Sequence, residues 1–595
     1  MCVDVRVRSS LNRTLALPLL LALGACGAAG ADGLDEDEAE LRGGGPVDTT
    51  LPDVDAQGYD VDLRIDDAKG KESFSATTTG TFVATKNLDK LSLDFEGNTV
   101  DDVLVGKKKA AFEHKDGRLV ITLPSAVPSG KKFSVRVRYH GAIAQADGAD
   151  PNDFKAFGGL MVRQQNADKK RIFNSMNWPG KARRWIPLRD HPSDGASFAI
   201  TTTMPKSFVV LANGKEVEKK DNADGTRSTR FEATTPMPAY DFHVGAYEDW
   251  HEDTLQSSPV PMAAFTYSSA SAKSNAVFGD LPKAMKFFES TFGKYRWESA
   301  NFLEEPIFGG GMENAGVVSM DETLFADTNE ARFTAFHELS HHWSGNLVRI
   351  RSWNDFWLSE GFAQYLTAEA IGALDGPAAK QKRLRDYMAA VLHEDTNTPH
   401  ALRPSGDEVD VLTIFDAISY DKGALTLRML GSVVGPDKLN AFLKTWFDRH
   451  AFEAVTTADF QKELSVATKK DLSKFFDGFV SGTHHPVMRV TYEAKGDGAD
   501  VTVEQVQTKG PAEGFVFPLA LDFVDAAGKT ERVAVDVTNK KTTAHVKLAR
   551  TPASVVVDPD EVVMGVATCD KSTCKTGFEC KADGEVVSVC EPPMP

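Results

Sequence analysis

The sequence predicts a multidomain α+β protein in which a mostly helical region lies between two β regions. At 595 residues the chain is longer than one hydrophobic core supports. Short runs with alternating apolar and polar residues fill the stretch from Tyr59 to Tyr139, which is typical of β-strands. Helical periods replace this alternation at Leu281–Phe292 and Thr413–Val434, and alternation returns from Val487 onward.

The first 25 residues have the form of a secretory signal peptide. Three arginines precede a short apolar run at residues 15–23, and Leu23-Gly24-Ala25-Cys26 resembles a bacterial lipobox, in which the cysteine is lipidated. We expect an exported protein of the bacterial cell envelope that is held to a membrane only by a lipid at Cys26. A plain cleaved signal with a secreted or periplasmic product is the alternative. Residues 26–54 read as an acidic, flexible tether.

The first folded region is predicted to be all-β and to span residues 55–250. A second group of strands is expected at Ser197–Met204 and Phe208–Leu211. Asn213-Gly214 follows these strands, and this dipeptide favours a two-residue β-hairpin turn. No arrangement of catalytic residue types is visible in this region.

A metal-binding motif, His337-Glu338-Leu339-Ser340-His341, lies in the helical region. Two histidines four residues apart lie on one face of a helix, where both imidazoles can bind one Zn²⁺. Glu338 points to the same site as a base that is not a ligand. Glu360, 19 residues after His341, is the candidate third ligand.

The residues around this motif predict two helices. Residues 331–336 contain good helix formers, and we expect this helix to end at a cap formed by Gly345-Asn346. A second helix at 356–370, capped by Asn354 or Asp355, would carry Glu360 in its first turns. His342 lies about 100° around the helix from His341 and is predicted to pack rather than to bind metal.

A glycine-rich segment, Gly309 to Asn314, precedes the motif. Glycines allow a backbone to approach a ligand closely, and the Glu313 carboxylate beside them could hold a cationic group. A flexible turn without a function is the alternative interpretation.

These motifs resemble those of the aminopeptidase N family of zinc metallopeptidases. The segment Gly310-Gly311-Met312-Glu313-Asn314 resembles the family's GxMEN motif. The segment His337–Leu366 is similar to the family's zinc-binding block, in which 18 residues separate the HExxH motif from a glutamate. Ser419–Ala424 is similar to the segment that holds the family's catalytic tyrosine. Residues 182–198 are similar to a signature of its β domain. The resemblance covers about residues 55–566. It is to the short members of the family, which do not have a large C-terminal helical domain.

The resemblance implies a fold in three parts. These are an N-terminal β-sandwich or saddle domain at 55–250, a thermolysin-like, mostly helical catalytic domain at 251–482, and a small C-terminal β-sandwich at 483–566. It also implies one Zn²⁺ per chain, bound by His337, His341 and Glu360.

The resemblance further implies roles for the remaining site residues. Glu338 would be the general base, and Tyr420 would stabilise the oxyanion. Glu313 would pair with the free α-ammonium of a peptide. The residues beside Glu313 would contact the substrate: Gly310, Gly311, Met312 and Asn314.

The predicted function is zinc-dependent removal of N-terminal residues from peptides. A thermolysin-like endopeptidase or oligopeptidase is one alternative, because that class shares the zinc motif. An inactive peptide-binding module is the other alternative. A net charge of −18 argues against nucleic-acid binding, which needs a basic surface. The sequence does not predict an oligomeric state.

One departure from the family concerns recognition of the amine. Where the family has a Gln-x-Glu pair in its β domain, this chain has Met176 and Trp178. Neither side chain is an anion. Asn177, Gln164 or Gln165 would be a neutral substitute.

The tail at 567–595 contains four cysteines, Cys569, Cys574, Cys580 and Cys590. In an exported protein two disulfides are expected, and four cysteines allow three pairings. A second zinc site is the alternative, but the spacing is not that of two CxxC pairs.

Overall fold

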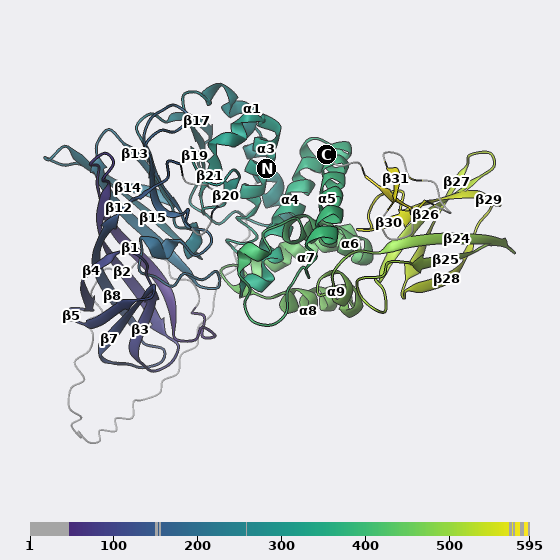
Figure 1. Ribbon diagram of the computed structural model, residues 1–595, viewed down its shortest axis with the longest axis horizontal. Helices are drawn as coiled ribbons and strands as arrows, with labels where there is room; N and C mark the ends of the chain where they lie inside the picture. The colour runs from purple at the N-terminus through teal and green to yellow at the C-terminus, as the bar shows by residue number, and fades with distance from the viewer. Residues whose placement is uncertain are drawn as a thin grey trace, which may run out of the picture.

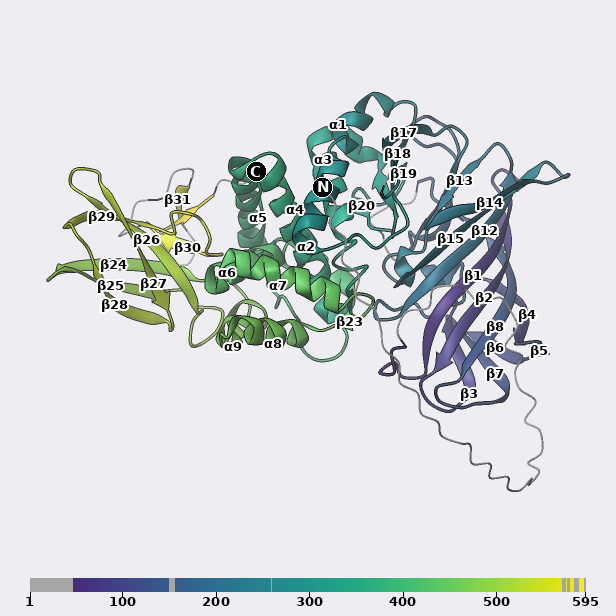
Figure 2. The ribbon, with the colours of Figure 1, turned by 180° about the vertical axis from the view of Figure 1, so that it is seen from behind.

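A computed structural model describes residues 47–148, 153, 156–257, 259–569, 574, 578–582 and 588–592. The predicted signal peptide, Cys26 and most of the acidic tether lie outside the described residues. The described chain forms a β region, a helical region and a second β region in a row (Figures 1 and 2). This order confirms the predicted fold class.

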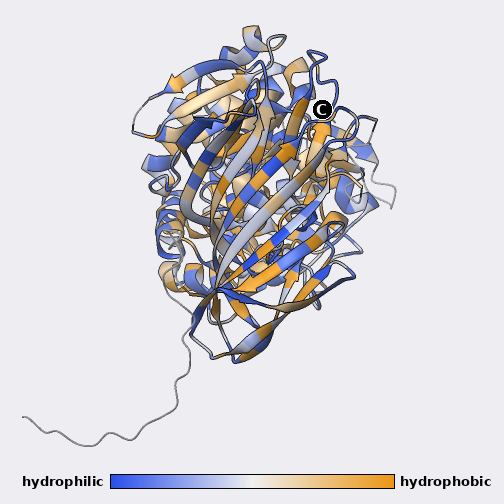
Figure 3. Ribbon diagram, turned by 90° about the vertical axis from the view of Figure 1, so that its left-hand side faces the viewer, coloured by the Kyte–Doolittle hydropathy of each residue, from blue (hydrophilic) through white to orange (hydrophobic). Residues whose placement is uncertain are grey.

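The N-terminal β region is built on one eight-stranded sheet. Its strands are Lys215–Asp221 (β14), Thr226–Pro238 (β15), Gly195–Pro205 (β12), Val54–Asp66 (β1), Ser73–Ala84 (β2), Lys132–Ala142 (β8), Thr99–Val105 (β4) and Lys108–Lys109 (β5), given in their order across the sheet. Strand β1 pairs in parallel with β12 and antiparallel with β2. Buried and exposed residues alternate along β8, and Figure 3 shows hydrophilic and hydrophobic residues alternating along the strands of this sheet.

Two smaller sheets complete this region. One contains Leu88–Asp94 (β3), Arg118–Val127 (β7) and Ala111–Lys115 (β6). The other contains Val209–Ala212 (β13), Val244–Tyr247 (β16), Ile172–Met176 (β11), Gly159–Arg163 (β10) and Ala144–Gln145 (β9). Every strand predicted from alternation in this region is present in one of the three sheets.

The hairpin predicted at Asn213-Gly214 is wrong. Strand β13 before it pairs with β16, whereas β14 after it pairs with β15 in the large sheet. The buried Asn213 side chain donates hydrogen bonds to the carbonyls of Asp241 and Ala315, both at 2.9 Å. Gly214 has φ +88°, and a Cβ there would lie 2.1 Å from the Glu232 carbonyl oxygen. The dipeptide therefore carries the chain from one sheet to another.

In the part of the chain that the structure describes, the helical region combines a mixed sheet with nine α-helices. The sheet, in spatial order, contains His251–Gln256 (β17), Met262–Thr266 (β18), Ala300–Glu305 (β19), Val317–Asp321 (β21) and Gly311–Met312 (β20). The helices are Ser274–Phe278 (α1), Leu281–Phe292 (α2), Thr328–Ser340 (α3), Trp357–Leu374 (α4), Pro377–Asn397 (α5), Gly423–Val434 (α6), Pro436–Arg449 (α7), Thr457–Thr468 (α8) and Ser473–Phe479 (α9). A short parallel pair, Arg349–Ile350 (β22) and Ala454–Val455 (β23), joins two loops.

The helical periods in the sequence predict α2 well and α6 only in part. Helix α2 has the predicted bounds because its buried residues recur at helical spacing along one face. The stretch predicted to be helical from Thr413 instead contains a 3₁₀ turn ending at Thr413, a loop, and a π-helical turn at Ile418–Lys422 before α6. Helix α8 starts at a capping box that Thr456 and Asp459 form.

The C-terminal region is a two-sheet sandwich, as predicted. One sheet contains Lys541–Lys547 (β28), Gly498–Gln505 (β25), Val487–Lys495 (β24), Val566–Thr568 (β30), Ser588–Glu591 (β32) and Glu579–Ala582 (β31). The other contains Thr530–Val537 (β27), Phe517–Asp525 (β26) and Pro552–Val557 (β29). The cysteine-rich tail joins this sandwich, because β32 pairs with β30.

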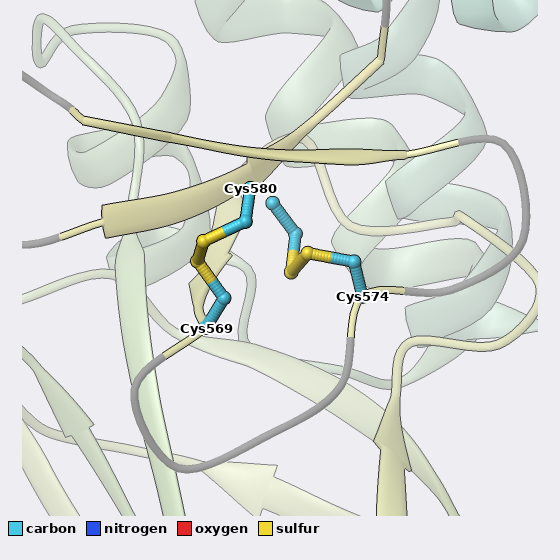
Figure 4. The surroundings of a disulfide bond; sticks show 4 residues. Cys569, Cys574 and Cys580 are labelled. Carbon is cyan, nitrogen blue, oxygen red and sulfur yellow. A yellow bond between two sulfur atoms is a disulfide. The ribbon is translucent and has the colours of Figure 1, made fainter.

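Disulfides hold the tail together, in agreement with the prediction. Cys569 is bonded to Cys580, and Cys574 is bonded to Cys590 (Figure 4). Cys580 on β31 lies opposite Cys590 on β32, so each bond joins one of these two strands to the segment that follows β30. Across the described residues, no helix has the length and apolar character needed to cross a membrane.

Candidate active site

Helix α3 positions the two histidines of the metal-binding motif. It starts at an Asp327 cap, whose carboxylate accepts a hydrogen bond from the Asn329 N–H at 2.9 Å. The predicted end of this helix at Gly345 is wrong, because α3 ends at Ser340. Ser340 Oγ donates to the carbonyls of His337 and Ala363, at 2.8 and 3.1 Å, which fixes the last turn of α3 against α4.

Helix α4 positions Glu360 in its first turn, as predicted, but the predicted cap is wrong. Residues 353–355 form a 3₁₀ turn, and no side chain caps α4. The Asn354 side chain donates to the carbonyls of Pro404 and Asp407, at 3.2 and 3.1 Å. Asp355 accepts from the Thr457 N–H at 3.0 Å. Both side chains therefore hold distant loops instead of the helix start.

The three candidate ligands meet in one buried cluster. His337 Nε2 lies 3.2 Å from Glu360 Oε2, and His341 Nε2 lies 3.1 Å from the same oxygen. The two Nε2 atoms are 3.0 Å apart. Donors on a tetrahedral Zn²⁺ with bonds of about 2 Å are separated by about 3.3 Å. Two imidazole nitrogens and a carboxylate oxygen at this spacing fit such an ion.

Contacts behind the cluster orient its donor atoms. His341 Nδ1 lies 3.0 Å from the Ser344 carbonyl oxygen, which keeps the proton on Nδ1 and leaves Nε2 free to bind a metal. Although burial disfavours the charged form, the neighbouring His341 and the hydrogen bond from His337 lower the pKa of Glu360 to about 2. Glu360 is therefore held as an anion, the form that binds a cation.

Glu338 lies in the same cleft without belonging to this cluster. Its side chain is buried, and Gly311 lies so close that a Cβ there would be 2.3 Å from Glu338 Oε1. Burial raises the pKa of Glu338 well above its usual value; the nearby His341 opposes this effect, and the Glu313 carboxylate adds to it. A carboxylate with a raised pKa is suited to accept and return a proton.

Tyr420 enters the cleft from the π-helical turn at Ile418–Lys422. Its ring stacks on that of His337, with centroids 6.0 Å apart and an interplanar angle of 19°. Burial raises the pKa of the Tyr420 phenol well above its ordinary value, and the Glu360 carboxylate raises it further. The phenol therefore keeps its proton and can donate a hydrogen bond.

Two residues of the glycine-rich segment, Gly311 and Met312, form the edge strand β20. Strand β20 pairs with β21 through Gly311 opposite Met320 and Met312 opposite Ser319. The next residue, Glu313, is buried, and its carbonyl accepts a hydrogen bond from Asn346 Nδ2 at 2.7 Å. Asn314 turns away from the cleft and donates to Ser319 Oγ at 2.9 Å, so its predicted contact with substrate stays a prediction.

One cleft of about 220 Å³ brings these groups together. It is lined by Trp178, Phe308, Gly310, Gly311, Met312, Glu313, Phe333, Thr334, His337, Glu338, His341, Glu360, Gln364, Phe415 and Tyr420. The set contains every predicted catalytic and metal-binding residue, and all the predicted substrate contacts except Asn314. Among the described lining residues there is no lysine or arginine.

Two family models match the chain. The peptidase family M1 domain matches residues 278–479, and the peptidase M1 N-terminal domain matches residues 55–240. Together these matches cover more than half of the chain, and the first includes the whole metal-binding cluster. The chain belongs to peptidase family M1.

Several M1 proteins are similar to this chain. Aminopeptidase N of Streptomyces lividans is 26% identical over 91% of this chain and 64% of its own length. Glutamyl aminopeptidase of Rattus norvegicus is 27% identical over 55% of this chain and 36% of its own length. The tricorn protease-interacting factor F2 of Thermoplasma volcanium is 25% identical over 60% of this chain and 46% of its own length. The chain thus spans between one third and two thirds of the length of these relatives.

A solved structure also shares the fold. It is a crystal structure of an M1 zinc metallopeptidase from Deinococcus radiodurans, determined with a Tyr-Ser-Ala substrate. It matches with a TM-score of 0.63 and 23% identity, over 72% of this chain and 94% of its own. At this identity the likeness shows a common fold.

The departure of this M1 chain at Trp178 changes one wall of the cleft. The Trp178 ring stacks on Phe356, with centroids 5.9 Å apart, and lies 4.9 Å from the ring of Phe415. Asn177 is not available as a neutral substitute for the missing acid, because its side chain donates to the Phe242 carbonyl and accepts from Trp185 Nε1. Gln164 and Gln165 do not line the cleft. An aromatic wall therefore stands where the family has a polar pair.

Sequence reasoning missed several lining residues of this M1 site. Gln364 lies four residues after Glu360, and Phe333 and Thr334 lie four and three residues before His337, so helix periodicity would have placed all three toward the cleft. His342 was predicted to pack rather than to bind metal, and its Nε2 accepts a hydrogen bond from the Gly316 N–H at 2.8 Å. Phe415 follows a 3₁₀ turn, and no sequence pattern indicated that it lines the cleft.

Proposed function

We propose that this protein is a zinc-dependent aminopeptidase, which hydrolyses peptides one residue at a time from their free N-terminus. The observation that carries the proposal is the position of Glu313. This buried carboxylate lines the same cleft as the metal-binding cluster and directly follows the edge strand β20. Relatives named as aminopeptidases support the same activity.

Five residues of the cleft have roles in the chemical steps of the proposed reaction. His337, His341 and Glu360 would hold a zinc ion, which would supply Lewis-acid chemistry for the scissile carbonyl and the attacking water. Glu338 takes a proton from that water and passes it to the leaving amine. The Tyr420 phenol donates a hydrogen bond to the oxyanion that develops on the carbonyl, and such donors contribute about 3 kcal/mol.

Glu313 selects the end of the peptide. A free α-ammonium group is a cation at neutral pH, and a buried carboxylate attracts it more strongly than an exposed one because solvent screens the pair less. A blocked N-terminus would leave this carboxylate buried without a partner. The proposed activity is therefore that of an exopeptidase, in contrast to thermolysin-like cleavage inside a chain.

The cleft predicts a preference for substrates with an apolar first residue. Trp178, Phe308 and Phe415 form an aromatic wall, and the charged groups in the lining are carboxylates and histidines. We expect leucyl and phenylalanyl arylamides to exceed the glutamyl arylamide in kcat/KM by at least about tenfold, because a substrate carboxylate would be desolvated near like charges. Equal or better hydrolysis of the glutamyl substrate would contradict this assignment.

A panel of aminoacyl arylamides, each beside its N-acetylated form, tests the proposal as a whole. With zinc present, the free amines should be hydrolysed and the acetylated forms should not. A chelator should abolish hydrolysis, and added zinc should restore it. Hydrolysis of the acetylated substrates would favour an endopeptidase, and no hydrolysis of any peptide substrate by zinc-loaded protein would favour an inactive binding module.

We also propose export and lipid anchoring, supported by the lipobox-like sequence that ends at Cys26. When the full chain is expressed in a bacterium, we expect it to partition into detergent with membranes. Cys26→Ala should move it to the aqueous fraction with its arylamidase activity unchanged. If the wild-type protein stays in the aqueous fraction, lipid anchoring at Cys26 is wrong.

A further inference from the structure

A buried ion pair lies next to Tyr420, where the catalytic helices meet the loop that leads to the C-terminal sandwich. Lys422 ends the π-helical turn that contains Tyr420, and its Nζ lies 3.0 Å from Asp395 Oδ1 on α5. Both side chains are 0% exposed. Desolvation makes such a pair a poor source of net stability, so its presence calls for another explanation.

The ion pair also holds the loop between α9 and β24. Lys422 Nζ donates to the His484 carbonyl at 3.0 Å, and His485 Nδ1 lies 2.9 Å from Asp395 Oδ2. The hydrogen bond from His485 and the charge of Lys422 outweigh the effect of burial and lower the pKa of Asp395 to about 2. Burial lowers the pKa of Lys422, and the Asp395 carboxylate opposes this effect. The contacts of Lys422 and Asp395 tie three segments to one point: the π-helical turn, α5 and the first loop of the sandwich.

The turn that carries Tyr420 has other anchors at its ends. Asp416 accepts from the Ile418 N–H at 2.9 Å at its start, and Asp421 accepts from Gln364 Nε2 at 2.9 Å. After the turn, Gly423 packs against Gly361 so closely that a Cβ on Gly361 would lie 2.7 Å from Gly423 Cα. A π-helical turn is a rare conformation that is frequent at functional sites. Its position relative to the ligands on α3 and α4 is set by these contacts.

We propose that Lys422 is a positioning residue for Tyr420, and that it makes the geometry of the active site depend on the docking of the C-terminal sandwich. Lys422 holds the turn against Asp395 and the His484 carbonyl, and the turn holds the Tyr420 phenol beside His337. The inference rests on the proposed function, because that function gives Tyr420 its role as an oxyanion donor. A displacement of about 1 Å in such a group costs on the order of 100-fold in rate.

The test compares Lys422→Met in two backgrounds. In the wild-type background, kcat for a leucyl arylamide should fall about 10- to 100-fold, with KM and zinc content nearly unchanged. In a Tyr420→Phe background, the same substitution should lower kcat by less than about twofold, since the group that it positions is already absent. An equal loss in both backgrounds, or no loss in the first, would overturn the proposal.

Arg428→Met is the matched control. Arg428 lies on α6 and also reaches the C-terminal region, where it donates to the Asp560 carbonyl at 2.9 Å. Its other hydrogen bond among the described residues goes to Gln381 on α5, so neither holds the π-helical turn. This variant should lose stability without a change in kcat. If Lys422→Met does not fold, the double variant with Asp395→Leu removes both charges of the pair, so that neither is left buried alone. It also removes the carboxylate that His485 contacts. The kcat of this double variant should likewise fall when Tyr420 is present and change by less than about twofold in the Tyr420→Phe background.

Amide hydrogen exchange tests the positioning without any turnover. Exchange in residues 416–424 should accelerate in Lys422→Met, or in the double variant, and not in Arg428→Met. Unchanged exchange in this segment would overturn the proposal. A wild-type protein that hydrolyses no peptide would overturn the proposed function instead, and the exchange measurement would still decide whether Lys422 holds the turn.

Discussion

Glu338→Gln is expected to bind zinc as the wild-type protein does and to lose about 10²- to 10⁴-fold in kcat. Glutamine has nearly the same shape as glutamate, so the close packing against Gly311 is kept. The amide cannot take a proton from water at neutral pH, whereas the buried carboxylate with its raised pKa can. Steady-state kinetics at saturating zinc, together with the metal content of the purified protein, measure both quantities.

Glu330→Gln is the control for this substitution. Glu330 lies on the same helix, two turns before Glu338, and pairs with Arg383 near the surface. We expect its kcat to stay within about twofold of the wild-type value, since exposed ion pairs contribute little. Near-normal turnover in Glu338→Gln would remove Glu338 from the mechanism.

His341→Ala is expected to lose both the metal and all measurable turnover. His341 Nε2 lies within 3.1 Å of both other donor atoms, so its removal leaves two ligands where a zinc site in a peptidase needs three. Metal analysis after dialysis should give less than about one tenth of a zinc ion per chain, against about one for the wild-type protein.

The neighbouring His342 separates loss of a ligand from general damage to the helix. It is equally buried, but its ring nitrogens contact the Gly316 N–H and the Glu338 carbonyl. His342→Gln should therefore lower thermal stability and retain zinc in the folded fraction. Zinc retained by His341→Ala would contradict the ligand assignment, as would zinc lost from folded His342→Gln.

The metal-binding part of the site could be predicted from the sequence because its residues are close together along the chain. The roles predicted for Glu313 and Tyr420 depended on the family resemblance. His337, Glu338 and His341 fall on one helix face, and Glu360 follows in the next helix of the pattern. The fold class also followed from periodicity, and α2 was predicted to its end residues because one face of that helix is buried. Sequence patterns predict the structure of a segment well where contacts between residues near in the chain determine that structure.

The predictions that were wrong concern segments whose structure depends on contacts with residues far away in the sequence. Asn354 and Asp355 have the composition of helix caps, but they bond to loops about 50 and 100 residues away. Asn213-Gly214 has the composition of a hairpin, but its strands belong to different sheets. The association of Lys422 with Asp395 and His485 joins three segments that no sequence pattern connects.

Trp178 shows that contacts between residues far apart in the sequence also limited the prediction of the site itself. The sequence indicated that the family's acid is missing there, but it could not show what takes its place. In the structure, an aromatic wall of Trp178, Phe308 and Phe415 lines the cleft there. In this protein Glu313 is therefore the acidic side chain that we assign to recognition of the amine.

The most direct test of the central claim is mass spectrometry of the early products from one unstructured decapeptide, in its free and N-acetylated forms. With zinc-loaded protein, the free peptide should shorten from its amino end in single-residue steps, and the acetylated peptide should remain intact. Fragments from internal cleavage, or equal consumption of the acetylated peptide, would contradict hydrolysis directed by Glu313 from the N-terminus.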